Sequence, residues 1–117
     1  MNKYVVKLTP ADFDEIKSWK LKRNKCCFVM FYLNGCKWCE ETKVVWNKLA
    51  KTVTFYTIAA YECDTYPEHF QRIMKDVPHL IDGYPTLVVY KEGEPVHVYE
   101  GDRTFEKLLN VCIKACK

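Results

Sequence analysis

Residues 26–33, with the sequence CCFVMFYL, constrain the fold more than any other segment, because they form an apolar and aromatic run that no charged residue interrupts. A run of strand length without polar alternation is typical of a strand buried on both faces of a sheet. Residues 53–61, VTFYTIAAY, predict a second buried strand in the same way. The sequence therefore predicts an α/β fold with residues 26–33 as a central strand.

Further strands are predicted where short apolar runs are bounded by turn residues, and helices where apolar residues recur every three or four positions. The predicted strands are residues 4–8, 26–33, 53–61, 84–90 and 95–100. The predicted helices are residues 10–21, 36–51, 66–75 and 104–115. The first of these helices depends on Thr9 as its cap and Pro10 at its first position. Strands and helices alternate up to residue 75, and a hairpin with the loop KEGE then makes the connections antiparallel.

The composition is that of one compact globular domain. The chain has 117 residues, of which 49% are apolar and 28% are charged, and a chain of this length buries about two thirds of its surface on folding. We therefore predict a single domain over residues 1–117. The formal net charge is only +3 and basic residues are interleaved with acidic ones, so the sequence lacks the electrostatic footprint of a nucleic-acid-binding protein.

The N-terminal sequence and the cysteines together predict where the protein works. The first apolar run, residues 4–6, is too short for the core of a signal peptide or for a membrane span. We therefore expect a cytoplasmic protein without membrane contact, acting as a monomer. Seven cysteines cannot all pair within one chain, and in a reducing compartment cysteines are expected to be catalytic, metal-binding or merely buried.

The segment LNGCKWCEE, residues 33–41, carries the strongest chemical signal. Cys36 and Cys39 lie at the start of a predicted helix, which leaves three interpretations: a redox couple, half of a metal site, or two buried thiols. A helix start after a loop favours the redox couple, since unpaired N–H groups and the helix dipole stabilise a Cys36 thiolate. Cys39, one turn later on the apolar stripe, is positioned to attack the Cys36 sulfur in a mixed disulfide.

Three segments together resemble the thioredoxin superfamily: FVMFYLNGCKWC, DGYPTLVVYKEGE and YEGDRTFEKLL. The last two are closer to protein disulfide isomerase domains than to small thioredoxins, and the resemblance covers essentially the whole chain. It implies a thioredoxin fold, with a central mixed β-sheet of four to five strands flanked by about four helices. It also implies a cis peptide bond before Pro85, which presents the backbone of Tyr84 to an extended substrate.

The function that this resemblance implies is that of a thiol-disulfide oxidoreductase acting on protein disulfides or dithiols. Cys36 is then the nucleophile and Cys39 the resolving cysteine. The residues expected at the substrate are Trp38, Tyr84 and Pro85. We expect protein substrates and a recycling reductase or oxidase as partners, and neither a cofactor nor a metal.

The sequence departs from the family pattern at several positions of this site. Met30 occupies the position where the family usually has a buried acid that exchanges the proton of the resolving thiol, and Ala60 that of a lysine often found near this acid. Gly35 replaces an aromatic residue, and Val44 replaces a proline. These departures affect proton transfer and leave the nucleophile intact.

The missing proton relay keeps a second function open. The alternative is a protein-binding module on the same fold, with slow or vestigial redox activity and a groove beside Tyr84 and Trp38. The charges next to the cysteine pair leave the net direction of their effect on the Cys36 thiolate open. Lys37 favours the thiolate and tunes the couple, whereas Glu40 and Glu41 oppose it.

The other cysteines and the histidines predict no second site. Cys112 and Cys116 share the apolar stripe of the last predicted helix, which favours small buried side chains over a second redox pair. The remaining cysteines, without metal-ligand spacing, are Cys26, Cys27 and Cys63. Three isolated histidines are expected at the surface: His69, His79 and His97.

Overall fold

The computed structural model describes residues 1–23, 25–55 and 57–115. At its centre lies a five-stranded mixed sheet in the order β1-β3-β2-β4-β5. The strands are β1 (Val6–Lys7), β2 (Cys27–Tyr32), β3 (Thr57–Glu62), β4 (Thr86–Lys91) and β5 (Glu94–Tyr99). β3 pairs in parallel with β1 and β2, whereas β4 pairs antiparallel with β2 and β5. The predicted α/β class and mixed sheet are confirmed.

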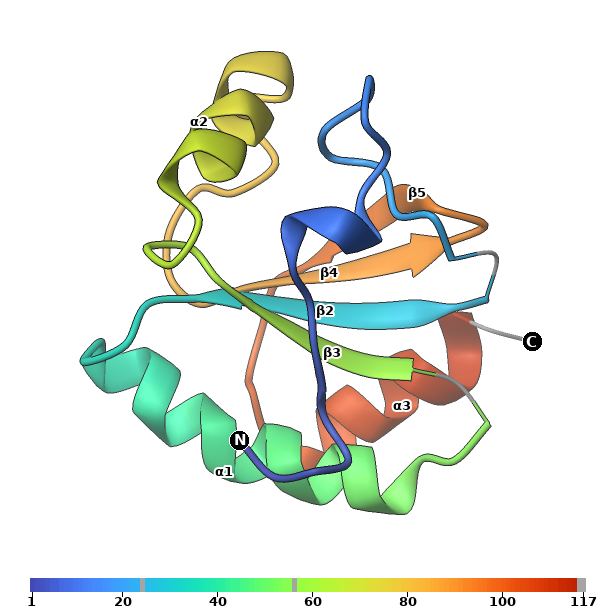
Figure 1. Ribbon diagram of the computed structural model, residues 1–117. Helices are drawn as coiled ribbons and strands as arrows, with labels where there is room; N and C mark the ends of the chain where they lie inside the picture. The colour runs from blue at the N-terminus through green and yellow to red at the C-terminus, as the bar shows by residue number, and fades with distance from the viewer. Residues whose placement is uncertain (24, 56, 116–117) are drawn as a thin grey trace.

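Three α-helices cover the sheet. They are α1 (Lys37–Thr52), α2 (Pro67–Asp76) and α3 (Phe105–Ala115). α1 and α3 pack on one face of the sheet, and α2 lies on the other face together with residues 8–23 (Figure 1). The sequence predicted about four helices, whereas the described residues contain these three and a short 3-10 turn, Pro10–Asp12.

The first predicted helix is wrong beyond this turn. The chain instead continues as an irregular segment in which Phe13 and Leu21 form an isolated antiparallel bridge. The Asp14 carboxylate accepts hydrogen bonds from the N–H groups of Ile16 and Lys17, at 3.0 and 2.7 Å. Aspartate side chains compete with helix formation in this way, because they satisfy backbone donors locally. The segment still contributes to the core, since Phe13 and Leu21 are buried.

β2 is buried on both faces, as its uninterrupted apolar sequence predicts. Phe28 and Met30 belong to the core between the sheet and the helices α1 and α3, whereas Val29 and Phe31 belong to the core on the α2 side. This alternation follows from the two-residue period of a strand. β2 ends at Tyr32, where the chain turns toward the start of α1.

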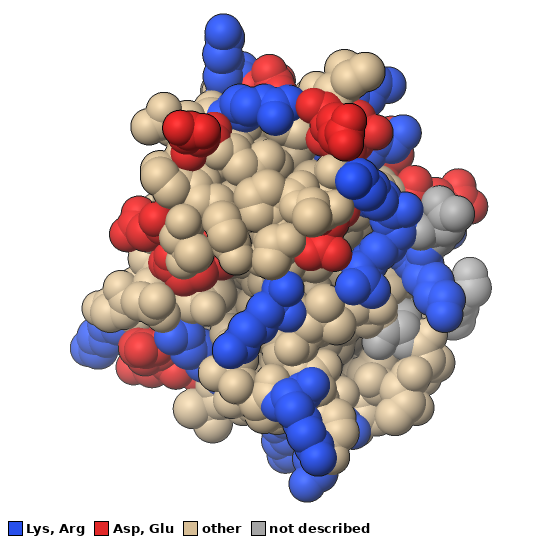
Figure 2. Space-filling model, in the orientation of Figure 1, with Lys and Arg blue, Asp and Glu red and all other residues tan. Residues whose placement is uncertain are grey.

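The surface carries charges of both signs. Figure 2 shows Lys and Arg side chains interspersed with Asp and Glu side chains on the visible face, so the small net charge of +3 reflects a mixture rather than a deficit of charged residues. None of the helices in the described residues combines the length and the apolar character that a membrane span needs.

Candidate active site

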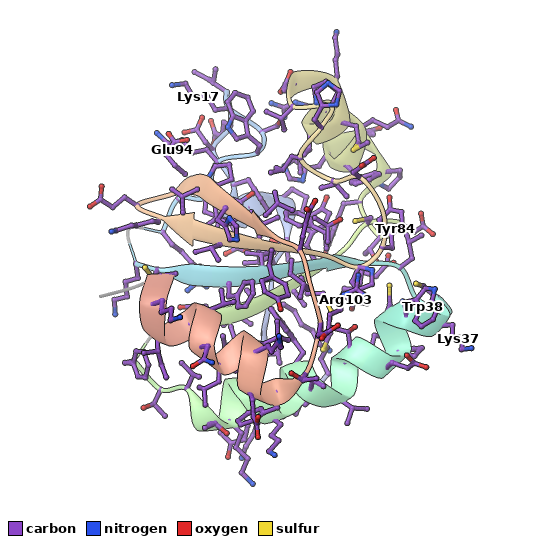
Figure 3. The ribbon with its side chains drawn as sticks, turned by 180° about the vertical axis from the view of Figure 1, so that it is seen from behind. Lys17, Lys37, Trp38, Tyr84, Glu94 and Arg103 are labelled. Carbon is purple, nitrogen blue, oxygen red and sulfur yellow. The ribbon has the colours of Figure 1, made fainter. Side chains whose placement is uncertain are left out.

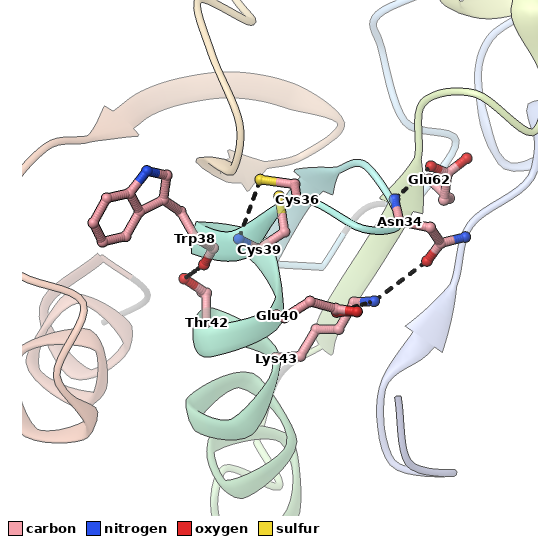
Figure 4. Close-up of polar contacts among 8 residues, drawn as sticks. All are labelled: Asn34, Cys36, Trp38, Cys39, Glu40, Thr42, Lys43 and Glu62. Atoms are coloured by element: carbon pink, nitrogen blue, oxygen red, sulfur yellow. Dashed lines mark hydrogen bonds and ion pairs between the residues drawn. The ribbon is translucent and has the colours of Figure 1, made fainter.

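Cys36 lies at the N-terminus of α1, and a short turn connects it to the end of β2. Gly35 has a φ of 80°, a backbone conformation that favours glycine and turns the chain into the helix. Cys36 is the N-cap of α1, and its Sγ accepts a hydrogen bond from the backbone N–H of Cys39 at 3.3 Å (Figure 4). The sulfur is thus placed at the N-terminal end of the helix, which is the positive end of its dipole.

Cys39 lies one helical turn later and has the opposite environment. Its side chain is fully buried on the face of α1 that also buries Trp46, whereas Cys36 is partly exposed. Burial, and then the hydrogen bond with Cys36, raises the pKa of Cys39 to about 11. Met30 and Ala60 pair across β2 and β3 in the same core, so the departures noted in the sequence lie in the sheet that Cys39 packs against.

The loop before β4 brings Tyr84 and Pro85 to the cysteine pair. The Tyr84–Pro85 peptide bond is cis, and the Cys36 thiol lies 3.8 Å from the Tyr84 carbonyl oxygen, to which it donates. Pro85 is buried and Tyr84 is half-buried. Both line a cavity of about 470 Å³, which also contacts Arg103. The Cys36 thiol therefore lies beside a residue that lines this cavity.

Trp38 lies on the other side of the pair and is 57% exposed. Its backbone carbonyl accepts a hydrogen bond from the Thr42 hydroxyl at 2.8 Å, and the Nζ of Lys37 lies 5.3 Å from the centroid of its ring. Trp38 lines a second cavity, of about 380 Å³, which also contacts Arg103. The charge of Lys37 is thus placed over the indole, and its predicted tuning of the couple stays a prediction.

The structure brings the predicted site residues together at one end of the sheet. Figure 3 shows Lys37, Trp38 and Tyr84 near one another, although they come from α1 and from the loop before β4. Arg103, from the loop before α3, lies among them and was not predicted. The only sequence signal for Arg103 is its place in the segment YEGDRTFEKLL.

The chain is similar to known proteins both in sequence and in structure. The sequence profile of the Thioredoxin family matches residues 4–114. The chain belongs to the thioredoxin family. The crystal structure of the J-Trx1 fragment of ERdj5 matches it with a TM-score of 0.74 and 25% sequence identity, over 97% of this chain and 50% of that chain. The resemblance inferred from the three sequence segments is therefore confirmed.

Relatives of this thioredoxin domain include proteins named as disulfide isomerases. Protein disulfide-isomerase like 2-2 of Arabidopsis thaliana is 30% identical over 114 residues, which cover 97% of this chain and 24% of the relative. Protein disulfide isomerase-like 5-1 of Oryza sativa subsp. japonica is 31% identical over 112 residues, which cover 91% of this chain and 68% of the relative. This chain spans about a quarter of the length of the Arabidopsis protein.

The other free cysteines of the thioredoxin domain are buried. They are Cys27, Cys63 and Cys112, each 1% exposed. Burial raises the pKa of Cys27 and of Cys112 to about 12, so these thiols are protonated at neutral pH. Cys116 lies outside the described residues. Within the described ranges, no group of three or more His, Cys, Asp or Glu side chains is arranged to hold a metal ion.

His69 is buried, so its predicted surface position is wrong, whereas His79 and His97 are exposed. Its Nε2 lies 3.0 Å from the Ser18 carbonyl oxygen, and its Nδ1 lies 2.9 Å from the Tyr61 hydroxyl. A carbonyl only accepts, so Nε2 carries the proton and Nδ1 accepts from Tyr61. Burial lowers the pKa of His69. Its sequence neighbours carry no signal of these partners, which come from distant segments.

Proposed function

We propose that this thioredoxin domain exchanges disulfides with protein substrates, with Cys36 as the nucleophile and Cys39 as the resolving cysteine. One observation carries the proposal: Cys36 is partly exposed at the N-cap of α1, whereas Cys39 is fully buried one turn later. Of the two cysteines of this pair, Cys36 is therefore the one accessible to the disulfide of another protein before the reaction.

The exchange proceeds in two displacements at sulfur. The Cys36 thiolate first attacks one sulfur of the substrate disulfide, so that a mixed disulfide forms and the other substrate sulfur leaves as a thiolate. Cys39 then loses its proton to water and attacks the Cys36 sulfur. The bond between Cys36 and the substrate breaks, and the second substrate sulfur leaves as a thiolate. Two electrons have passed to the substrate, and the same steps in reverse oxidise a substrate dithiol.

The surroundings of Cys36 support a protein segment as the substrate. The Tyr84 carbonyl lies beside the thiol, and two cavities that share Gly101 and Arg103 lie nearby, one at Tyr84 and Pro85 and the other at Trp38. An extended chain placed here meets backbone acceptors and an exposed aromatic ring, which are general features of peptide recognition. The names of the isomerase relatives support the same substrate class. A recycling reductase or oxidase completes the proposed cycle.

Insulin reduction with dithiothreitol as the final reductant tests this function. The wild-type chain is expected to accelerate the reaction, and Cys36→Ser is expected to reduce the rate to that of dithiothreitol alone, because the accessible thiolate is lost. Cys27→Ser is the matched control, since it removes a free cysteine at the start of β2 that is buried in the core on the other face of the sheet. Equal rates for the wild type and Cys36→Ser would exclude the proposed activity.

A second candidate function is a protein-binding module with slow redox activity. It is favoured by Met30, which is fully buried in the core that contains Cys39 and offers that thiol no group able to take a proton. Equilibration of the cysteine pair with glutathione buffers separates the two candidates. If the chain exchanges disulfides, we expect the pair to equilibrate within minutes. If it is a binding module, we expect the pair to exchange no faster than a free cysteine. Peptide binding is then expected to be the same in the wild type and in the Cys36→Ser/Cys39→Ser variant.

A further inference from the structure

Lys43 is a charged side chain beside the cysteine pair for which the exchange steps above have no role. It follows Cys39 by four residues on α1, so the two side chains lie on the same side of the helix. Its Nζ lies 2.7 Å from Oε2 of Glu40 and donates to Oδ1 of Asn34 at 3.3 Å (Figure 4). The same Nζ lies 4.8 Å from the centroid of the Tyr32 ring. Only 18% of the Lys43 side chain is exposed, so its ammonium is held in place.

The Cys39 thiol has surroundings that disfavour its ionised form. It is fully buried in a core shared with Met30 and Ala60. Among the described residues, no carboxylate, amine or imidazole is hydrogen-bonded to it. Burial raises the pKa of Cys39, the neighbouring Cys36 adds to this rise, and the ammonium of Lys43 acts in the opposite direction. The resolving step nevertheless requires a Cys39 thiolate.

We propose that Lys43 is a positioning residue for the resolving step, in which its ammonium stabilises the thiolate that forms on Cys39. The inference rests on the proposed function. As the S–H bond of Cys39 breaks, its proton passes to water and negative charge develops on the sulfur near Lys43. The charge then leaves with the substrate thiolate when the bond between Cys36 and Cys39 forms. Lys43 itself neither gives nor takes a proton.

Among the described cations at this end of the sheet, Lys43 acts on the Cys39 thiol, whereas Arg103 lines the two cavities at Tyr84 and Trp38. The groups on this side of the core are Cys36 and Glu40 on α1, Tyr32 on β2, Glu62 and Cys63 at the end of β3, Tyr84 before β4, and Cys112 on α3. Each of them is neutral or negative when it titrates. Lys37 is turned toward Trp38 instead. Glu40 partly offsets the charge of Lys43, which gives the two residues opposite expected effects.

The test is a thiolate titration that does not depend on turnover. In the Cys36→Ala background, absorbance at 240 nm is followed against pH, and the trace of the Cys36→Ala/Cys39→Ala variant is subtracted so that only Cys39 contributes. Lys43→Gln removes the charge and Lys43→Arg keeps it. Lys48→Gln is the matched control, because Lys48 lies on the same helix but over the Phe105 ring, at 4.2 Å from its centroid. Circular dichroism confirms that each variant is folded.

Lys43→Gln is expected to raise the pKa of Cys39, which lowers its thiolate fraction at neutral pH. Because a more basic thiolate is also a better nucleophile, the resolving step should slow by less than the thiolate fraction falls. Lys43→Arg is expected to restore the wild-type titration, and Lys48→Gln to leave it unchanged. Glu40→Gln is expected to shift the titration in the other direction, a result that a merely structural ion pair does not produce.

Two results would overturn the role of Lys43. One is an unchanged Cys39 titration in folded Lys43→Gln, and the other is an equal rise in Lys43→Gln and Lys48→Gln. If Lys43→Gln does not fold, Glu40→Gln decides, since an unchanged or raised pKa in that variant contradicts the proposal. Absence of insulin reduction by the wild-type chain would instead overturn the proposed function. The titration would still show whether Lys43 stabilises the Cys39 thiolate.

Discussion

The two faces of the sheet differ in what holds their cores together. On the face covered by α1 and α3, the Trp46 indole packs edge-on against Phe28, with ring centroids 4.8 Å apart, and donates one hydrogen bond to Ala59 of the sheet at 2.9 Å. On the face covered by α2, His69 bonds both Tyr61 and the backbone of residue 18, and buried polar groups link α2 to the irregular N-terminal segment.

This difference matches the different tasks of the two faces. The α1 face packs a regular helix through apolar contacts, and the reactive pair lies at the N-terminal end of that helix. The α2 face holds an irregular segment, whose backbone groups need hydrogen-bond partners when they are buried. Ser18 shows this best, because its carbonyl accepts from His69 and its hydroxyl donates to Asp76 at 2.7 Å. The cysteine pair is thus placed on the α1 face, which depends less on buried hydrogen bonds than the α2 face does.

The largest effect is expected on the α1 face, from Trp46→Ala. The Trp46 side chain is fully buried, and loss of such a side chain costs about 3–5 kcal/mol of unfolding free energy. Urea unfolding followed by circular dichroism measures the change. A cost below about 1 kcal/mol would show that the α1 face is not held by apolar packing.

A smaller effect is expected on the α2 face from Tyr61→Phe. This change removes the hydroxyl that donates to Nδ1 of His69 and keeps the ring, so a buried acceptor loses its partner at a cost of about 1–3 kcal/mol. Tyr66→Phe is the matched control, since the Tyr66 ring lies 5.8 Å from that of Tyr61 and its hydroxyl has no hydrogen-bond partner among the described residues. Equal unfolding free energies for both variants would contradict the buried network.

The same network predicts a pH dependence that the α1 face lacks. The pKa of His69 is lowered in the fold, mainly by burial, from its usual value of 6.5. The unfolded chain therefore binds a proton below about pH 6.5 that the folded chain resists, so stability falls as the pH falls through this range. Between pH 7 and pH 5 stability is expected to fall, by at most about 2 kcal/mol, which is the limit for one group over this interval.

Chemical unfolding of wild type and His69→Gln at several pH values checks this expectation. The variant is expected to be less stable at pH 7 and to lose less on acidification. His97→Gln is the control, because His97 is exposed and its removal should leave the slope as it is. An identical slope in wild type and His69→Gln would mean that His69 is not the group that titrates.

The smallest change in stability is expected from Trp38→Ala, on the same helix as Trp46. Trp38 is 57% exposed, and substitutions at such positions usually change the unfolding free energy by less than about 0.5 kcal/mol. Its loss should instead raise KM for insulin reduction, because the ring lines a cavity beside the pair. A change in stability as large as that of Trp46→Ala would remove the contrast between the two tryptophans.

The same contrast explains which parts of the molecule could be predicted from the sequence. Regular periodicity and the run at residues 26–33 predicted β2, α1 and the position of Cys36, because these depend on local sequence and apolar burial. The bridge of Phe13 with Leu21 and the burial of His69 against Ser18 and Tyr61 depend on partners in other segments, of which Ser18 lies 51 residues from His69. Arg103 becomes informative only when folding places it beside Tyr84, and Lys43 only when Asn34 and Glu40 hold its ammonium.

Cys36 is proposed as the nucleophile and Cys39 as the resolving cysteine, and trapping with a protein disulfide tests these two roles most directly. Cys39→Ser and Cys36→Ser are each incubated with oxidised insulin, and intact mass spectrometry with peptide mapping locates the adduct. We predict that Cys39→Ser accumulates a mixed disulfide through Cys36 and that Cys36→Ser forms none, since its remaining thiol of the pair is fully buried. An adduct through Cys39 in Cys36→Ser, formed at a comparable rate, would contradict the account.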